Sequence, residues 1–582
     1  MGSGLSYFEA APAKRGQTMA EDCREKIMSD AYVDFIWKSD YNVRELERLY
    51  PQYCVQILND FYAVFYVESR ILEQNRIPYS YDVFPILYTL LENENLEKSG
   101  IMQLLEHSVL QLRGEGVIVG IIDTGIDYTN DCFKKMDGTT RILEIWDQAD
   151  QSGRLPEGIG YGSVYGQAEI NQALKSDDPF SIVPSRDEFG HGTQLASIAA
   201  GSVDNDRGWT GAAPMSDLAI VKLKPAKKRI MRYYMVRPDA EAYQENDIMM
   251  GVRYLNELAY REKKPLVICI ALGSNRGGHE GTTPLSVALN SVAVRSGRCV
   301  VAAGGNEANQ GHHFYGNLRD GKPFEDVELR VADNEYGLMM ELWSSTPDLL
   351  AISMISPSGE EIPRVSSSLV GQQYNFLFEK TIVYIDFQAL DPSSGEELIL
   401  IRMFAPSPGI WKLRVYGTSI IHGVYNIWLP VKGFISEGTV FPYSNPDITL
   451  TSPANAETPI AVAGYQVQND SIYIASSRGY TRRGRIKPDI AAPGVEVCGF
   501  EPGNRIACLT GTSAAAAIAA GASALLLEWG IVRNNRPSMG TLEVKQLMIR
   551  GARRNPRDLY PNRSWGYGAL DLYSSFQLLG RF

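Results

Sequence analysis

Three short motifs stand along the chain in the order Asp, His, Ser. They are Asp123-Thr-Gly-Ile-Asp, Gly190-His191-Gly-Thr and Gly511-Thr-Ser513-Ala. A serine hydroxyl is a weak nucleophile at neutral pH and needs an adjacent base to accept its proton. An imidazole can take that proton and pass it to a departing amine, while a carboxylate on the other ring nitrogen fixes the tautomer. The set predicts acyl transfer by a serine nucleophile.

A fourth motif, Ala302-Ala-Gly-Gly-Asn306-Glu, supplies a side-chain amide that can donate to a developing oxyanion. A serine at a helix N-terminus adds backbone N–H groups and the positive end of the helix dipole. Taken singly, such motifs are usually turns, loops or helix caps. Their common order, each after a strand or at a helix start, favours the catalytic interpretation.

The elements that must position these residues alternate between strands and helices. Asp123 ends an apolar run that begins at Val117, which is typical of a buried parallel strand. Further apolar runs cover 218–221, 266–272 and 299–303, and helical patterns cover 194–200, 246–261 and 285–296. This alternation predicts a parallel α/β sheet.

Two regions depart from that pattern. Residues 314–445 show short alternating strands separated by Gly, Pro, Asp and Ser, which predicts an all-β sandwich or jelly roll. Residues 31–90 read as a small α+β unit, with strands near 32–37 and 62–67 and a helix over 43–58. Residues 1–30 are expected to be unstructured or an extension, and the first 18, which are rich in Gly, Ser and Ala, are expected to be unstructured.

The combined motifs resemble the subtilisin family of serine proteases (peptidase family S8), whose triad runs Asp, His, Ser along the chain. Three further segments resemble that family: Ile270-Ala-Leu-Gly-Ser, Lys487-Pro-Asp-Ile-Ala-Ala-Pro-Gly and Trp565-Gly-Tyr-Gly-Ala-Leu-Asp. The resemblance covers about 117–313 and 446–576. It implies a subtilisin-like three-layer α/β fold for residues 91–313 and 446–582, an α+β propeptide at 31–90, and an inserted jelly-roll-like domain at 314–445.

The resemblance also implies roles for single residues. Asp123 orients, His191 is the general base, Ser513 is the nucleophile and Asn306 donates to the oxyanion. Substrate binding falls to Leu272, Gly273, Ser274, Ala303 and Gly304. By the family's usual spacing, Ser513 cuts the propeptide around Thr89, Leu90 and Leu91, and the cut propeptide stays as a non-covalent inhibitor.

The propeptide and the insertion are most similar in architecture to the Csp-type subtilisins of clostridial spore germination. That resemblance implies that the natural substrate is another protein's pro-form. Two departures from the family are Ala517, where a proline is usual, and a long basic loop at 224–232. The loop is expected on the surface, with recognition of acidic substrate side chains as the alternative. Two other readings stay open: a pseudoprotease scaffold, and carbohydrate binding by the insertion.

Composition excludes several other classes of protein. The 582 residues carry a net charge of −12, which argues against a nucleic-acid partner. We identify no run close to the ~20 apolar residues of a membrane span and no secretory signal, so we expect a cytoplasmic protein, or one associated with spores or released by a non-classical route. The seven scattered cysteines are expected to be buried reduced thiols. His312 and His313 are expected in a solvated loop, and no metal or other cofactor is expected.

Overall fold

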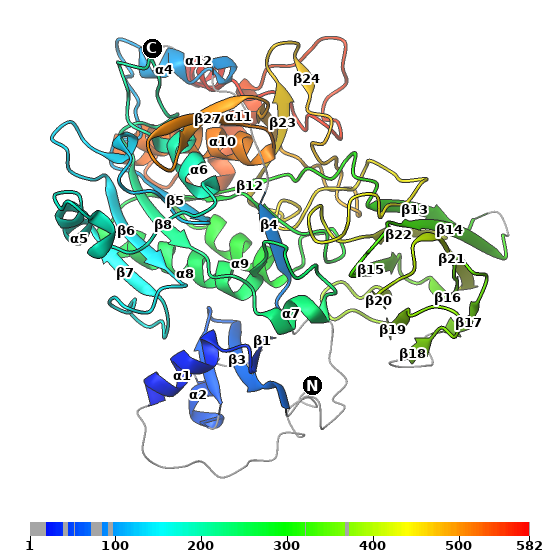
Figure 1. The fold of residues 1–582 in the computed structure, drawn as a ribbon. Helices are drawn as coiled ribbons and strands as arrows, with labels where there is room; N and C mark the ends of the chain where they lie inside the picture. Colours follow the sequence, from blue (N-terminus) through cyan, green and yellow to red (C-terminus); the bar gives the residue numbers. More distant parts are fainter. Residues whose placement is uncertain are drawn as a thin grey trace.

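The computed structural model describes residues 19–38, 45–51, 53–70, 84–90, 97–319, 322–366 and 372–580. Its centre is a nine-stranded sheet in the order β24-β23-β12-β10-β5-β8-β6-β7, with β25 beside β23 (Figure 1). The strands are β5 Ile118–Asp123, β6 Ile142–Asp147, β7 Ser163–Gly166, β8 Asp217–Lys222, β10 Leu266–Ile270, β12 Arg298–Ala303, β23 Ile460–Gln466, β24 Ser471–Ile472 and β25 Ile490–Pro493. The pairs β6–β7 and β23–β24 are antiparallel and the other pairs are parallel. The predicted α/β fold around a mainly parallel sheet is confirmed.

Helices cover both faces of this sheet, and β5 shows why. Val119 and Ile121 face one apolar cluster with the helices α6 (His191–Ala200) and α10 (Thr512–Leu527). Ile118 and Ile122, which alternate with them, face α8 (Glu245–Glu262) and α9 (Pro284–Ala293) on the opposite side. A strand buried on both faces reads as an unbroken apolar run, as this one does. The remaining helices here are α4 Met102–Leu105, α5 Gln167–Ala173, α11 Thr541–Gly551 and α12 Leu572–Gly580, with a π-helical turn at Glu528–Val532.

The inserted region forms two antiparallel sheets packed face to face beside the central sheet (Figure 1). Their orders are β13-β22-β15-β20-β19-β18 and β14-β21-β16-β17. The strands are β13 His313–Asn317, β14 Phe324–Val331, β15 Gly337–Ser344, β16 Leu349–Ile355, β17 Glu361–Ser366, β18 Gln372–Asn375, β19 Ile382–Gln388, β20 Leu398–Phe404, β21 Gly409–Ser419 and β22 Val424–Trp428. All pairings are antiparallel, as the alternating sequence pattern indicates.

The N-terminal unit contains a three-stranded antiparallel sheet in the order β1-β3-β2, and its described residues include the helices α1 and α2. Its elements are α1 Met19–Met28, β1 Tyr32–Lys38, α2 Leu46–Leu49, β2 Cys54–Ile57 and β3 Tyr62–Glu68. The helix expected over 43–58 is therefore wrong in its second half, because Cys54 and Val55 pair with Tyr66 and Phe65. Within the segment 1–30, which was expected to be unstructured or an extension, residues 19–28 are helical and Ile27 is buried. Residues 1–18 lie outside the described residues.

Further corrections concern the cysteines and the apolar helix. Cys23 pairs with Cys54, and Cys498 of β26 (Val497–Glu501) pairs with Cys508 of β27 (Arg505–Leu509), so four of the expected thiols form disulfides. Cys132, Cys269 and Cys299 are free and buried, as expected. The stretch Thr512–Val532 is long and apolar enough to span a membrane, contrary to expectation, although 83% of its most apolar window is buried inside the protein.

Candidate active site

Asp123 and His191 form a buried pair at one end of the central sheet. Asp123 is the last residue of β5, and its Oδ1 lies 2.7 Å from Nδ1 of His191. Both side chains are almost fully buried, at 1% and 6% exposure. The backbone N–H of Thr124 also donates to Asp123 Oδ1 at 2.8 Å. A buried carboxylate at this nitrogen favours the tautomer with Nε2 free to accept a proton, and it stabilises the imidazolium.

His191 is the first residue of α6, and the glycines around it explain the motif. Gly190 has φ +84°, a conformation that side chains other than glycine rarely adopt. A Cβ on Gly192 would lie 2.3 Å from the carbonyl oxygen of Gly125, so only glycine lets the Asp-Thr-Gly turn approach the helix. Asp187 completes the arrangement, because its carboxylate accepts the N–H groups of Gly190 and Thr193 at 2.8 Å each.

Ser513 lies in the first turn of α10, fully buried, where the helix dipole presents its positive end. The preceding residue, Thr512, joins this turn to the segment that carries Asn306. Its hydroxyl accepts the N–H of Gly305 at 3.0 Å, and its own N–H donates to Asn306 Oδ1 at 3.0 Å. With its oxygen occupied, Asn306 has its amide N–H₂ left to donate. Thr512 was missed by sequence reasoning, although it stands inside the Gly-Thr-Ser motif.

The predicted substrate-binding residues come from two segments joined by a third. Leu272 and Gly273 form β11, and the next residue, Ser274, exchanges two backbone hydrogen bonds with Ser452 at 3.0 and 2.8 Å. Ala303 ends β12, and Gly304 accepts the N–H of Thr451 at 3.0 Å. Residues 451–452 therefore lie between both predicted segments, and sequence reasoning did not single them out.

A strand from upstream of the catalytic region pairs with the predicted substrate-binding segment at residues 272–273. Strand β4 (Leu87–Leu90) is antiparallel to both β11 and β9 (Tyr243–Gln244). Leu90 pairs with Leu272, Thr89 with Gly273, and Tyr88 with Tyr243. The backbone of the predicted cut region is therefore held by β11, a predicted substrate-binding segment. Leu91 lies outside the described residues.

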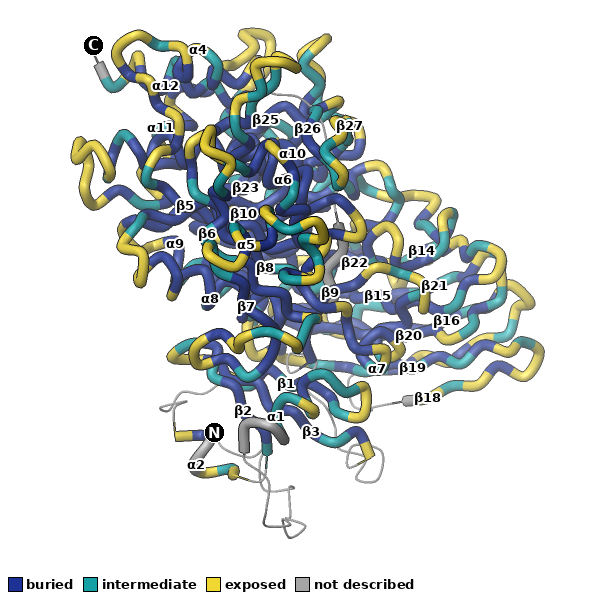
Figure 2. Tube along the Cα trace, turned by 60° about the vertical axis from the view of Figure 1, so that its left-hand side comes forward, coloured by how far each residue is buried: buried dark blue, intermediate teal, exposed yellow. Residues whose placement is uncertain are grey.

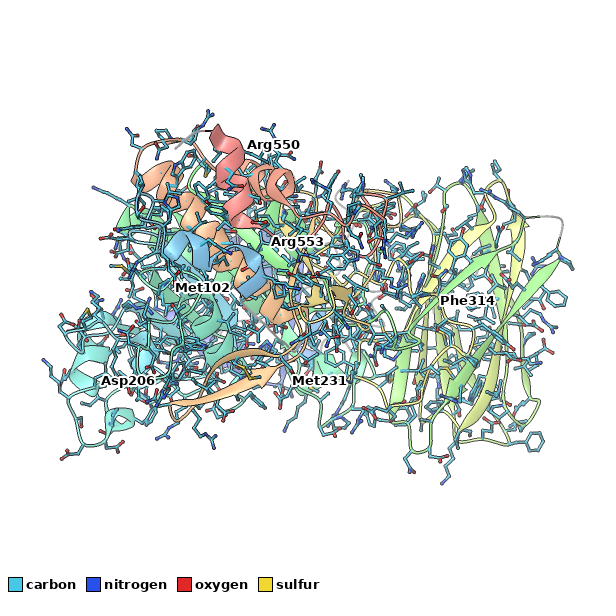
Figure 3. The ribbon with its side chains drawn as sticks, turned by 90° about the horizontal axis from the view of Figure 1, so that it is seen from above. Met102, Asp206, Met231, Phe314, Arg550 and Arg553 are labelled. Atoms are coloured by element: carbon cyan, nitrogen blue, oxygen red, sulfur yellow. A yellow bond between two sulfur atoms is a disulfide. The ribbon has the colours of Figure 1, made fainter. Side chains whose placement is uncertain are left out.

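The basic loop at 224–232 is not a surface loop, which corrects that expectation. It contains helix α7 (Lys228–Tyr233), and Ile230 and Met231 are buried. They belong to a cluster with members from the N-terminal unit, the α7 region and the insertion, which we call the junction cluster. Its members are Val33, Leu46, Val55, Ala63, Phe65, Val67, Phe84, Ala226, Ile230, Met231, Tyr234, Val236, Ala242, Met339, Leu400, Val431 and Phe434. Figure 3 shows Met231 between the central sheet and the antiparallel sheets around Phe314.

The paired histidines are also buried, not solvated as expected. His312 Nδ1 lies 2.6 Å from Glu307 Oε2, next to Asn306 in sequence. His313 stacks on Trp428 of β22 with ring centroids 4.9 Å apart, and burial lowers its pKa to about 4. Across the described ranges, no three His, Cys, Asp or Glu side chains are grouped to hold a metal ion.

The profile of the Subtilase family matches residues 114–367 and 435–568. The chain belongs to this family. Among solved structures, this subtilase is similar to the CspB protease of Clostridium perfringens, with 31% identity, a TM-score of 0.74, and coverage of 83% of this chain and 96% of that one. The fold and the resemblance to Csp-type subtilisins are thereby confirmed.

Curated relatives match a shorter stretch of this subtilase. The membrane-bound transcription factor site-1 protease of Mus musculus is 35% identical over 141 residues, which cover 23% of this chain and 13% of that protein. The serine protease AprX of Bacillus subtilis is 32% identical over 153 residues, covering 23% of this chain and 33% of AprX. The chain thus matches only a minor part of the length of these relatives.

Proposed function

We propose that this subtilase is a serine endopeptidase that cuts its own chain near residue 90 and then keeps the cut propeptide in its groove. The observation that carries the proposal is the buried 2.7 Å contact between Asp123 and His191, in a fold whose Ser513 opens α10. The strand β4, held in the groove beside β11, supports the self-cleavage.

The reaction uses groups that the fold already orients. Ser513 Oγ attacks the scissile carbonyl carbon and gives its proton to His191 Nε2, while Asp123 holds Nδ1. The amide of Asn306 and the backbone N–H groups at the start of α10 donate to the oxyanion. The C–N bond breaks, the amine leaves with the proton from His191, and water then hydrolyses the ester. The last step returns Ser513 and leaves a free carboxylate on the propeptide.

Retention of the propeptide is supported by its contacts on two faces of β3. Tyr62, Val64 and Tyr66 pack among residues of the α8 and α9 layer. Ala63, Phe65 and Val67 face the junction cluster instead. A strand buried on both sides stays in place after one peptide bond downstream is cut, because the cut removes none of these contacts. Every residue of β3 except Glu68 is buried, whereas β1 is more mixed (Figure 2).

The test compares the wild-type chain with Ser513→Ala, both purified from a protease-deficient host and measured by intact mass. We expect wild type to give two fragments with the break near Leu90. The variant should give a single full-length chain. Two fragments from both proteins would refute self-cleavage. A single chain from both would favour the pseudoprotease scaffold.

A further inference from the structure

The residues just upstream of β4 also bind the catalytic region. The N–H of Ile86 donates to Glu245 Oε2 at 3.3 Å, and the carbonyl of Ile86 accepts the N–H of Glu245 at 2.8 Å. One residue of the catalytic region, Glu245, therefore binds both the N–H and the carbonyl of Ile86. We call residues 84–90 the tail. Such contacts read an extended backbone whatever its side chain.

Glu245 is held in place by the fold itself, not by the tail alone. It is the first residue of α8, and its Oε1 accepts the N–H of Leu285 in the first turn of α9 at 3.0 Å. Two helix N-termini thus converge on one buried carboxylate, and each favours a negative charge at that position. The second oxygen, Oε2, accepts the N–H of Ile86.

Phe84 lies two residues further upstream, in an aromatic pocket. Its carbonyl accepts the hydroxyl of Tyr234 at 3.2 Å, and its ring centroid lies 4.4 Å from that of Tyr233. The guanidinium of Arg402, from the insertion, lies 4.7 Å from the centre of the Tyr233 ring. Phe84 is 5% exposed, and its ring centroid also lies 5.2 Å from that of Phe35 in β1, so the N-terminal unit supplies part of this enclosure.

We propose that the substrate groove continues past β9 and β11 into a second compartment, formed by Glu245, Tyr234 and Tyr233. This compartment takes an extended protein segment with an aromatic side chain six residues upstream of the position of Leu90. The proposal rests on the proposed function, because a substrate compartment presupposes a protease. It identifies the substrate class as unfolded segments or exposed tails of proteins, because a peptide beginning at the position of Leu87 would make none of these contacts.

The experiment measures hydrogen exchange of the backbone amides of residues 86–90 in full-length chains that carry Ser513→Ala. Phe84→Ala is compared with Phe61→Ala, which changes an exposed phenylalanine of the same N-terminal unit. We expect Phe84→Ala to speed exchange at least ~10-fold in these amides, because local opening sets exchange rates. Tyr234→Phe removes one hydroxyl and should give a smaller rise confined to the same amides.

These chains lack the Ser513 hydroxyl and cannot cleave themselves. The exchange result therefore does not depend on whether the wild type is self-cleaving. Exchange that rises in Phe84→Ala and Tyr234→Phe but not in Phe61→Ala supports the second compartment. If Phe84→Ala loosens β1 and β3 as well, Tyr234→Phe decides the question. Unchanged exchange in the tail of both variants would show that β9 and β11 alone hold it, and would overturn the proposal. In the chain that keeps Ser513, Phe84→Ala should also slow self-cleavage relative to Phe61→Ala.

Discussion

The catalytic centre and the junction cluster are both buried, but they are built in different ways. In the centre, each chemical group stands where a strand ends or a helix begins, within a few residues of the glycines that allow the close approach. In the junction cluster, side chains from three parts of the chain meet around α7, and its members range from Val33 to Phe434 along the sequence. Under the proposed function, the centre carries out the cleavage and the junction cluster holds the cut propeptide. Changes in one region should therefore affect cleavage, and changes in the other should affect retention.

The largest expected effect is at the carboxylate of the centre. Asp123→Asn keeps the shape but leaves His191 in the wrong tautomer, which costs about 10⁴-fold in other serine proteases. We expect conversion of the precursor to slow by about that factor, followed by intact mass over time. Asp206→Asn, an exposed change at the periphery (Figure 3), is the control. If the Asp123→Asn precursor is cleaved at the same rate as the control, Asp123 takes no part in the cleavage.

The next effect concerns the oxyanion. Asn306→Ala removes the side-chain amide whose oxygen accepts the N–H of Thr512. Cleavage of the precursor should slow about 10²–10³-fold, which is the effect of removing the corresponding asparagine of a subtilisin. The time course of precursor loss measures it, with the exposed Asn309→Ala in the same loop as control. Equal rates for the two variants would mean that Asn306 serves the fold alone.

A change beside the junction cluster, in the polar contacts of Asp34 next to Val33, should leave cleavage intact and loosen retention. Asp34, fully buried, pairs with Lys227 and accepts the amides of Gln244 at 2.9 Å and Asn246 at 3.1 Å. Asp34→Asn leaves the lysine charge buried without its partner, which typically costs about 3–5 kcal/mol. The cut propeptide should then dissociate about 10²–10³-fold more readily, seen as its loss on gel filtration. Asp60→Asn, exposed on the same unit, should retain it.

The smallest effect is a pH dependence at Glu245. Burial raises the pKa of this carboxyl from 4.5 to about 7. The folded chain therefore holds this proton more tightly than the unfolded chain does. The resulting contribution to the free energy of unfolding, at most about 3 kcal/mol, is full below pH 4.5 and is lost as pH rises towards 7.

Glu245→Gln in the Ser513→Ala chain cannot titrate, so its Tm should fall less between pH 4.5 and 7 than that of the parent. Glu262→Gln, exposed at the end of the same helix, should follow the parent. Parallel Tm curves for Glu245→Gln and the parent would contradict the assigned titration.

Sequence reasoning reached the centre but not the junction, for a physical reason. Asp123, His191 and Ser513 are marked by their immediate neighbours, so their placement follows from a few residues. The role of Lys227 depends on Asp34, 193 residues away, and no local pattern signals that contact. The stacking of His313 on Trp428, a residue far along the chain, has no local signal, whereas the carboxylate beside His312 belongs to Glu307, only five residues away in sequence. The local sequence pattern predicts a helix at the position of strand β2. The segment is a strand because its pairing with β3 outweighs that local propensity.

The most direct test of the division between cutting and holding is the native mass of the purified wild-type protein. If the centre cuts and the junction holds, the native assembly should weigh as much as the uncut wild-type chain plus one water, and denaturation should split it into two fragments at a break near Leu90. A native mass equal to that of the large fragment alone would show that the cut propeptide leaves, and would contradict the retention assigned to the junction.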